Sequence, residues 1–124
     1  MSKQALCPCG SGVYLVDCCG CYIAGMAAQT AEQLMRSRYT AYAIKNEAYL
    51  LATWHLRTRP RFLDEDEAKW LGLKIVKHQQ QDDTHAVVEF IARYKISGRA
   101  YRLHEISQFV FEEGRWFYLD GVLR

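Results

Sequence analysis

The chain has 124 residues, and half of them are hydrophobic, which suits one packed domain and excludes a disordered chain. A formal net charge of +2 makes nucleic acid an unexpected partner, because bulk charge gives it no support and only a local basic patch would leave it open. The apolar runs are too short to cross a membrane, and the first six residues lack the apolar stretch of a secretory signal, so we expect a cytoplasmic protein with no membrane partner.

All five cysteines lie in one short stretch near the N-terminus, from Cys7 to Cys21. A segment of small residues, 24–29, follows this stretch. We therefore divide the chain into an N-terminal knuckle, residues 1–23, and a second domain, residues 28–124.

The spacing of four cysteines predicts a metal site. Cys7 and Cys9 are separated by one residue, eight residues follow, and Cys18 and Cys19 are adjacent. Glycines between the two pairs tolerate the positive φ angles that a tight turn requires. Zinc binds four cysteine sulfurs as a closed tetrahedron, with no open position for water or substrate. The pattern predicts a structural Zn²⁺ site ligated by these four cysteines.

Two other uses of the thiols stay open at this stage. Disulfides need an oxidising compartment, which nothing in the sequence indicates, and five cysteines would leave one unpaired. A redox pair would join Cys18 to Cys19, or Cys7 to Cys9, in a small strained ring. Cys21 is expected to be a bystander, although it could replace Cys19 as the fourth ligand.

Two helices are predicted in the next part of the chain. Thr30 and Gln33 form a capping box at the start of the first helix, and apolar residues recur along it at helical spacing. Asn46 can cap the second helix, which carries Trp54 and has to end before Pro60.

A short third helix and four strands are predicted after Pro60. Asp64 and Glu67 form another capping box, and the helix they start is expected to end near Gly72. The apolar period then changes from about 3.6 to about 2. The first predicted strand begins with 73–76, and the others are 86–96, 101–111 and 115–119, the last ended by Asp120-Gly121. Turns are predicted at Asp82-Asp83, Ser97-Gly98 and Glu113-Gly114. This order predicts an α+β fold with helices on one face of an antiparallel sheet.

The cysteine motif resembles the SEC-C motif, a zinc knuckle at the C-terminus of the translocase motor SecA that contacts the chaperone SecB and the ribosome. The matching residues are Cys7-Pro8-Cys9-Gly10-Ser11-Gly12 and Cys18-Cys19-Gly20. The stretch 13–17 departs from the usual motif, because it contains no lysine and its Tyr14 stands one place early. The resemblance implies a zinc site. The contact with an acidic partner that the lysines of the usual motif make is not carried over to this chain.

Segments along the rest of the chain resemble the YchJ-like bacterial family. They are Leu34-Met35-Arg36-Ser37-Arg38-Tyr39, Thr53-Trp54-His55, the stretch from His104 to Phe109, and the stretch from Gly114 to Gly121. The resemblance implies a SEC-C knuckle joined to a nuclear-transport-factor-2-like cone, in which three helices pack on a bent antiparallel sheet. Some members carry a second SEC-C motif after the sheet. Because this chain stops at Arg124 without one, we expect no bridging role for two knuckles.

Folds of this type bend the sheet around a cavity, and four residues are candidates for it. Glu105 and Ser107 interrupt an apolar face of the third strand, and such a carboxylate is either paired or free to act as a general base. Arg38 lies in the apolar stripe of the first helix and is expected to pair with Glu105. His55, at the end of the second helix, is placed to reach the cavity mouth. Three further residues of the last strand could line the cavity: Trp116, Tyr118 and Asp120.

The leading functional hypothesis is a zinc-containing protein-interaction or adaptor module, linked to protein export or translation. In this hypothesis the knuckle presents Tyr14, Leu15 and Val16 to a protein partner. No recognisable catalytic motif occurs in the sequence, which favours a protein that is not an enzyme.

The alternative is a small-molecule-binding protein or enzyme that uses the cone cavity. Glu105 would be the base or anchor, and Arg38, Ser107 and His55 would orient the ligand. The basic stretch 57–61 is most simply a solvated loop, with an RNA or acidic-protein contact as the minor alternative. The outer face of the third strand alternates polar and apolar residues, which permits either a monomer or a homodimer.

Overall fold

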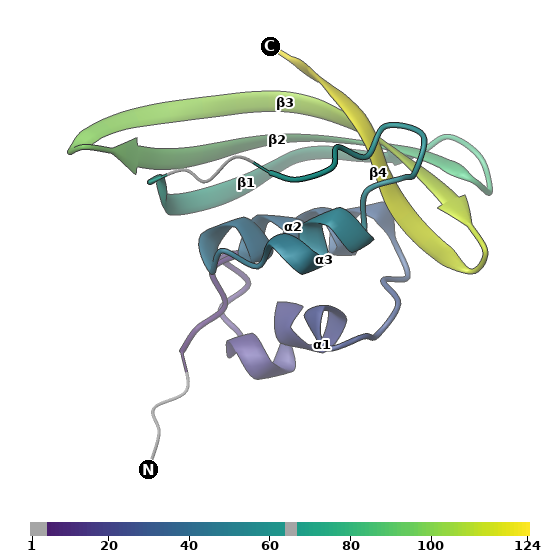
Figure 1. The fold of residues 1–124 in the computed structure, drawn as a ribbon, viewed down its shortest axis with the longest axis horizontal. Coiled ribbons are helices and arrows are strands. Elements are labelled where there is room, and N and C mark those ends of the chain that lie inside the picture. The colour runs from purple at the N-terminus through teal and green to yellow at the C-terminus, as the bar shows by residue number, and fades with distance from the viewer. Residues whose placement is uncertain (1–4, 64–66) are drawn as a thin grey trace.

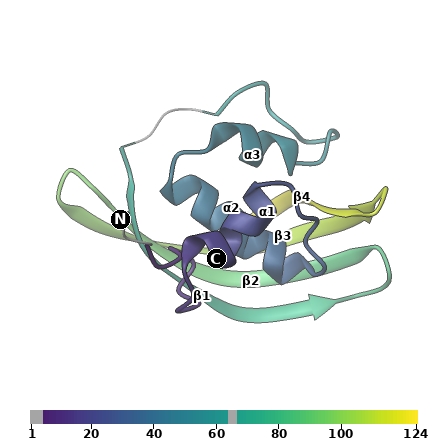
Figure 2. The same cartoon turned by 90° about the horizontal axis from the view of Figure 1, so that it is seen from below.

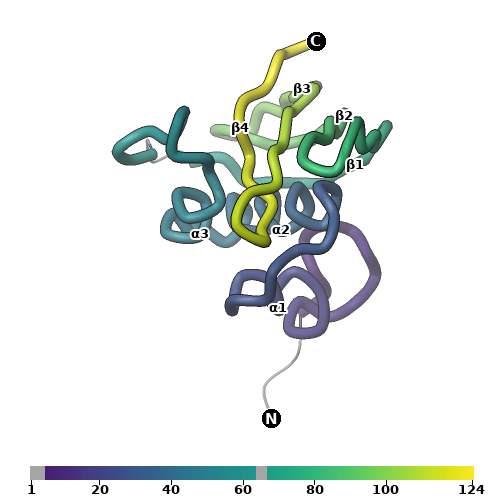
Figure 3. Tube along the Cα trace, turned by 90° about the vertical axis from the view of Figure 1, so that its right-hand side faces the viewer, coloured from purple at the N-terminus to yellow at the C-terminus, as the bar shows by residue number. Residues whose placement is uncertain are grey.

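The computed structural model describes residues 5–63 and 67–124. They form three layers: a four-stranded sheet, two helices that cover one of its faces, and the N-terminal knuckle beneath those helices (Figures 1 and 3). The elements in chain order are the 3-10 helix η1 (Leu15–Asp17), the helices α1 (Cys19–Ile23), α2 (Ala31–Ala43) and α3 (Glu47–Ala52), and the strands β1 (Lys69–Gln80), β2 (His85–Ile96), β3 (Arg99–Glu112) and β4 (Arg115–Leu123). The predicted α+β architecture, with three helices and a four-stranded antiparallel sheet, is confirmed. None of the described helices is long and apolar enough to span a membrane.

Polar side chains start both helices of the middle layer, as predicted. Thr30 Oγ1 accepts a hydrogen bond from the backbone N–H of Gln33 at 3.1 Å, and Asn46 Oδ1 accepts one from the N–H of Tyr49 at 3.0 Å. The Gln33 side chain accepts from the N–H of Gln29 at 2.7 Å, one residue before the donor that a capping box normally uses. These bonds satisfy N–H groups that the first turn of a helix leaves unpaired.

The segment after α3 attaches to β4 instead of continuing the helix. α3 ends at Ala52, so Trp54 lies outside it, in a parallel bridge with Tyr118. The Tyr118 N–H donates to Thr53 O and its carbonyl accepts from the N–H of His55, both at 2.8 Å. This pairing, and not a helix end, positions His55.

The sheet is an antiparallel meander in the order β1-β2-β3-β4. Ser97 and Glu113 each begin a tight turn with a φ near 50°, and the glycines that follow have φ angles near 80°. Two consecutive positive φ angles suit the turns that join twisted strands, so the predicted hairpins at Ser97-Gly98 and Glu113-Gly114 are confirmed. β4 runs past Asp120-Gly121 to Leu123, four residues beyond the predicted strand end, because its pairing with β3 continues.

The predicted helix ending near Gly72 is wrong in the part that the structure describes. Lys69 to Gly72 belong to β1 and pair with β2, while Asp64 of the predicted capping box lies outside the described residues. Trp70 lies opposite Tyr94, with ring centroids 5.1 Å apart. Packing of this aromatic on the sheet outweighs the local capping signal. The third α-helix is instead α1, within the knuckle.

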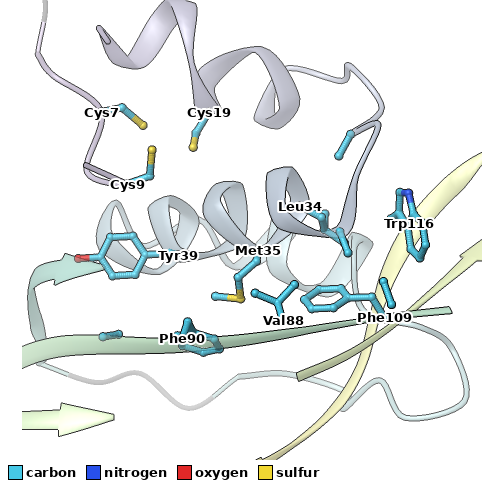
Figure 4. Packing of buried hydrophobic residues seen from close by; sticks show 14 residues of the cluster. Cys7, Cys9, Cys19, Leu34, Met35, Tyr39, Val88, Phe90, Phe109 and Trp116 are labelled. Carbon is cyan, nitrogen blue, oxygen red and sulfur yellow. The ribbon is translucent and has the colours of Figure 1, made fainter. Parts of the chain in front are cut away.

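The main core lies between α2 and the sheet (Figures 2 and 4). Side chains of α2 meet side chains of β2 and β3 there, and the central ones are Leu34, Met35, Tyr39, Val88, Phe90 and Phe109. Alternate residues of β2 are buried, as the predicted period of 2 requires. The cysteines of the knuckle join the same cluster from the other side of α2, so the knuckle packs on the domain and does not hang from it.

Candidate metal centre

Four cysteines of the knuckle converge on one point. The Sγ atoms of Cys7, Cys9, Cys18 and Cys19 all lie within 4.8 Å of one another. Cys7 and Cys9 come from a loop, Cys18 follows η1, and Cys19 begins α1. The labelled sulfurs of three of them face one another above α2 (Figure 4). The structure therefore brings together the four thiols that the sequence predicted.

Glycine conformations fold the loop that carries the first pair. Gly10 and Gly12 have φ angles of 84° and 83°, a region that residues with a Cβ rarely adopt. The Cys7 N–H donates to Val13 O at 2.8 Å, which closes the loop into a hairpin. The predicted glycine-dependent turn is confirmed.

The geometry of the cluster fits a tetrahedral zinc ion. Zinc–sulfur bonds are about 2.3 Å long, so the sulfurs of a tetrahedral site lie about 3.8 Å apart. Cys9 Sγ and Cys18 Sγ are 3.7 Å apart. An all-sulfur donor set is also the one that zinc prefers in closed structural sites. The residues present therefore match this metal in type, number and spacing.

The thiols interact strongly enough to change one another's acidity. A hydrogen bond from Cys19 is the main cause that lowers the pKa of Cys9 to about 4, against the opposing effect of burial. The same hydrogen bond raises the pKa of Cys19, and burial raises that of Cys18. Sulfurs this close carry one negative charge readily, whereas further thiolates need a cation between them.

Polar residues outside the motif fasten the site to α2. Cys7 Sγ lies 3.5 Å from the hydroxyl of Thr40, which is fully buried. Arg36 Nη1 donates to Cys9 O at 3.2 Å, and Ser11 Oγ lies 3.1 Å from Cys18 Sγ. Sequence reasoning did not assign Thr40 or Arg36 to the metal site, because both lie in α2, far from the cysteines in the sequence. Ser11, in contrast, belongs to the cysteine motif itself.

Cys21 lies outside the cluster. Its thiol donates to Val16 O at 3.4 Å, while Cys19 supplies the sulfur that joins the other three. None of the cysteines forms a disulfide. This arrangement favours Cys19 over Cys21 as the fourth donor.

A second site lies between α2 and the sheet, on the side away from the cysteines. It is a cavity of about 220 Å³. Aromatic and apolar side chains form most of its wall. The residues that bring polar groups to it are Arg38, Glu105 and Ser107, together with the aromatic residues Tyr39, Tyr42, Trp70 and Tyr118. The Trp70 Nε1–H is buried without a hydrogen-bond partner in the described part of the chain.

The predicted ion pair between Arg38 and Glu105 does not form. Arg38 Nη1 donates to Leu50 O at 2.8 Å and to Thr53 Oγ1 at 2.7 Å. Its guanidinium lies 4.6 Å from the ring centroid of Tyr118, within range of a cation–π contact. Burial lowers the pKa of Arg38, and the charge of Glu105 opposes that effect from a distance. A carbonyl at the end of α3, which sequence periodicity does not reveal, is the nearer acceptor.

Glu105 is held by hydroxyl groups. Ser107 Oγ donates to Glu105 Oε2 at 2.5 Å, and the Tyr118 hydroxyl donates to the same oxygen at 3.4 Å. Burial, and then the charge of Glu105, raise the pKa of Tyr118, so this phenol stays a donor. Glu105 and Ser107 lie on one face of β3, as predicted, and the hydrogen bond between them was not predicted.

Three other predicted cavity residues lie elsewhere. Trp116 is buried and its Nε1–H donates to Gln29 O at 3.3 Å, away from the cavity. His55 Nε2 lies 2.7 Å from Glu112 Oε2, and its ring packs edge-on against Phe117, so it does not line the cavity. A register shift in the β3–β4 pairing beside Gln108 places Asp120 opposite that residue, on the exposed face. A bulge of this kind reverses which face the following residues take.

Gly121 makes room for the Glu105 side chain. A Cβ added at Gly121 would overlap the Glu105 carboxylate, whereas one at Gly72 would meet nothing within 4 Å. We predict that Gly121→Ala lowers the free energy of unfolding by about 1–3 kcal/mol, because the carboxylate has to move. Urea denaturation measures this, with Gly72→Ala as the matched control. Equal stability of the two variants would contradict the packing described here.

Known proteins similar to this chain share both parts of it. A family model described as the YchJ middle NTF2-like domain matches residues 30–121. A UPF0225 protein of Bordetella parapertussis is 55% identical over 128 residues, covering 99% of this chain and 96% of the relative. A UPF0225 protein of Ralstonia nicotianae is 53% identical over 136 residues, covering 98% of this chain and 94% of the relative.

Two solved structures share the fold. The solution structure of a SEC-C motif containing protein from Rhodopseudomonas palustris matches with a TM-score of 0.84 and 36% identity, covering 94% of this chain and 96% of that one. The crystal structure of a SEC-C motif containing protein from Psychrobacter arcticus matches with a TM-score of 0.76 and 28% identity, covering 95% of this chain and 82% of that one.

Proposed function

The chain belongs to the UPF0225 family of bacterial proteins with a YchJ-like middle domain, and on this premise we propose that it is a zinc-containing adaptor that binds a protein partner through its knuckle. Cys7, Cys9, Cys18 and Cys19 hold the Zn²⁺. Four thiolates leave no open position on the metal, so its role is to hold the knuckle in shape.

The observation that carries this proposal is the exposed apolar surface of the knuckle. Leu6, Tyr14 and Val16 are 61%, 47% and 60% exposed, and Leu6 and Tyr14 are paired in a β-bridge. The knuckle buries its cysteines but exposes the apolar side chains next to them. Such a surface is suited to binding another protein. The prediction that Leu15 belongs to this surface is wrong, because its side chain packs against the core.

The nature of the partner is inferred by analogy with the SEC-C motif. The knuckle of SecA contacts SecB and the ribosome, which points to protein export or translation. The stretch 13–17 of this chain is apolar where that motif is lysine-rich. The partner surface is therefore apolar, and its binding depends little on salt.

Affinity capture with point variants tests this proposal. Tyr14→Asp/Val16→Asp removes the apolar surface without touching a cysteine. Leu56→Asp/Phe62→Asp is the matched control, since these residues are 78% and 65% exposed and lie outside the knuckle. We expect the knuckle variant to lose the partners that the parent and the control retain, with its zinc content unchanged. Identical partners for all three proteins would refute the proposal.

A second candidate function uses the cavity. Glu105 is not neutralised by a direct ion pair with Arg38, and the buried Trp70 N–H has no partner among the described residues. The cavity is smaller than sites for drug-sized ligands, so it suits a small aromatic molecule with a hydrogen-bond donor for Glu105. Indole, phenol and benzamidine are suitable probes. Binding should shift the NMR signal of the Trp70 indole N–H and should weaken in Glu105→Gln, and an unchanged spectrum would exclude this function.

A further inference from the structure

The outer face of the sheet gathers cations that lie far apart in the sequence. The helices and the knuckle all lie on one side of the sheet (Figures 1 and 3). On the other side, the segment around His55 packs against Phe117 of β4, whereas the outward cations of β1, β2 and β3 are exposed. The register places six exposed cationic side chains, referred to below as the basic face, on this side of β1, β2 and β3: Lys69, Lys74, Lys77, Arg93, Lys95 and Arg102. Arg124 adds a seventh beside them, since its N–H donates to His104 O.

Two like-charged pairs lie directly opposite each other within the basic face. Lys69 is opposite Lys95, and Arg93 is opposite Arg102. Facing side chains on adjacent strands have Cβ atoms only about 5 Å apart, and like charges at that distance destabilise a sheet. A sheet assembled for stability alone would place carboxylates between these cations.

The described residues supply few such carboxylates, and none lies between the two like-charged pairs. Glu89 lies opposite Lys77, and its Oε2 lies 2.7 Å from His104 Nε2, while Glu112 and Asp120 lie at the β4 side of this face. None of the six cations of the basic face forms an ion pair with a described residue. Their charge is therefore available to a partner, although the whole chain carries a net charge of only +2.

We propose that the basic face binds the phosphate backbone of single-stranded RNA. Arginine and lysine contacts to phosphates are the main source of affinity for nucleic acids, and the guanidinium groups of Arg93 and Arg102 can bind phosphate oxygens in pairs. A sheet three strands wide is too broad for the groove of a duplex, which admits a helix or a two-stranded ribbon. An extended single strand can follow the rows of cations across the sheet.

Binding at this face does not depend on base sequence. The outward positions that flank the cations are Ile91, Ile106, Glu89 and His104, and the His104 ring is engaged by Glu89, which leaves no phenylalanine, tyrosine or tryptophan among them for base stacking. Contacts to the backbone alone carry no sequence information. The inference is independent of the knuckle, which lies on the opposite side of α2 (Figure 3).

Fluorescence anisotropy on the full zinc-loaded chain with a labelled 20-nucleotide oligouridine tests this inference. The face variant is Arg93→Gln/Arg102→Gln. The control is Arg57→Gln/Arg61→Gln, which removes the same charge from the exposed loop 57–61. We expect the face variant to bind about tenfold more weakly and to lose about 1.4 from the slope of log affinity against log salt, the contribution of two contacts to single-stranded phosphates. The control should bind like the parent.

A melting curve separates loss of binding from loss of fold. Since the face variant relieves a like-charge contact, its Tm should equal or exceed that of the parent. Equal affinity of the face variant and the parent would overturn the proposal, as would equal losses in the face and loop variants. Polyglutamate of 20 residues and vesicles with anionic headgroups are the competing polyanions. Displacement of the RNA by either one at matched charge would assign the face to that partner instead.

Discussion

Replacing Cys9 by serine removes the zinc and lowers the free energy of unfolding by at least about 3 kcal/mol, which for a chain of this size lowers the Tm by roughly 10 °C or more. Cys9 is 1% exposed and belongs to the same buried cluster as Leu34 and Tyr39 of α2. Loss of the metal therefore releases the knuckle and uncovers part of the core. Zinc content and a thermal melt followed by circular dichroism measure the two effects together.

Cys21→Ser is the matched control, because it removes a thiol from the same knuckle without touching the cluster. Its sulfur makes a single weak hydrogen bond, to Val16 O, so we expect full zinc content and a Tm within about 1 °C of the parent. A Cys9→Ser protein that keeps its zinc and its Tm would show that the four sulfurs are not the ligands.

Arg38→Met is the second substitution with a large expected effect. Arg38 is 3% exposed, and its Nη1 donates to Leu50 O and Thr53 Oγ1. Methionine fills similar space but cannot donate to those two oxygens, and it removes the positive charge that acts on Glu105 from a distance. We expect the free energy of unfolding at neutral pH to fall by about 3–5 kcal/mol, because two hydrogen bonds from a buried charged donor are lost.

A double-mutant cycle separates the charge effect from the lost hydrogen bonds. Glu105→Gln removes the uncompensated carboxylate, so Arg38→Met/Glu105→Gln should recover about 1–2 kcal/mol relative to the sum of the single changes. Urea denaturation of the four proteins gives this coupling. If the effects simply add, the long-range interaction between Arg38 and Glu105 has no energetic weight, and the loss belongs to the carbonyl and hydroxyl contacts alone.

Local chemistry in the sequence predicted much of the molecule. Cysteine spacing with Gly10 and Gly12 predicted the loop that gathers the sulfurs, and Thr30 and Asn46 predicted two helix starts. Each of these signals acts within a few residues, where side chain and backbone interact in any fold. The fold class and the YchJ-like resemblance were also confirmed, the latter by the family match.

Features that depend on distant packing could not be predicted in this way. Thr40 contacts Cys7 only because the knuckle docks on α2. Asp120 faces outward because a register shift precedes it. The segment before Leu73 is a strand and not a helix because Trp70 packs on Tyr94. The opposed cations of the basic face likewise became apparent only with the pairing register, since Arg93 and Arg102 belong to different strands.

The two proposed binding surfaces lie on opposite sides of the molecule. The knuckle is on the far side of α2 and α3 from the sheet, and the basic face is the outer side of the sheet (Figures 1 and 3). One chain could therefore hold a protein partner and an RNA strand at the same time without overlap.

The most direct test of the metal centre is the zinc content of protein purified without chelator, combined with thiol titration before and after the metal is released. We predict close to one zinc per chain, with Cys21 the single fast-reacting thiol beforehand and all five cysteines reactive afterwards. Protein that contains no zinc and has five fast-reacting thiols from the start would contradict the site and favour redox chemistry at the cluster instead.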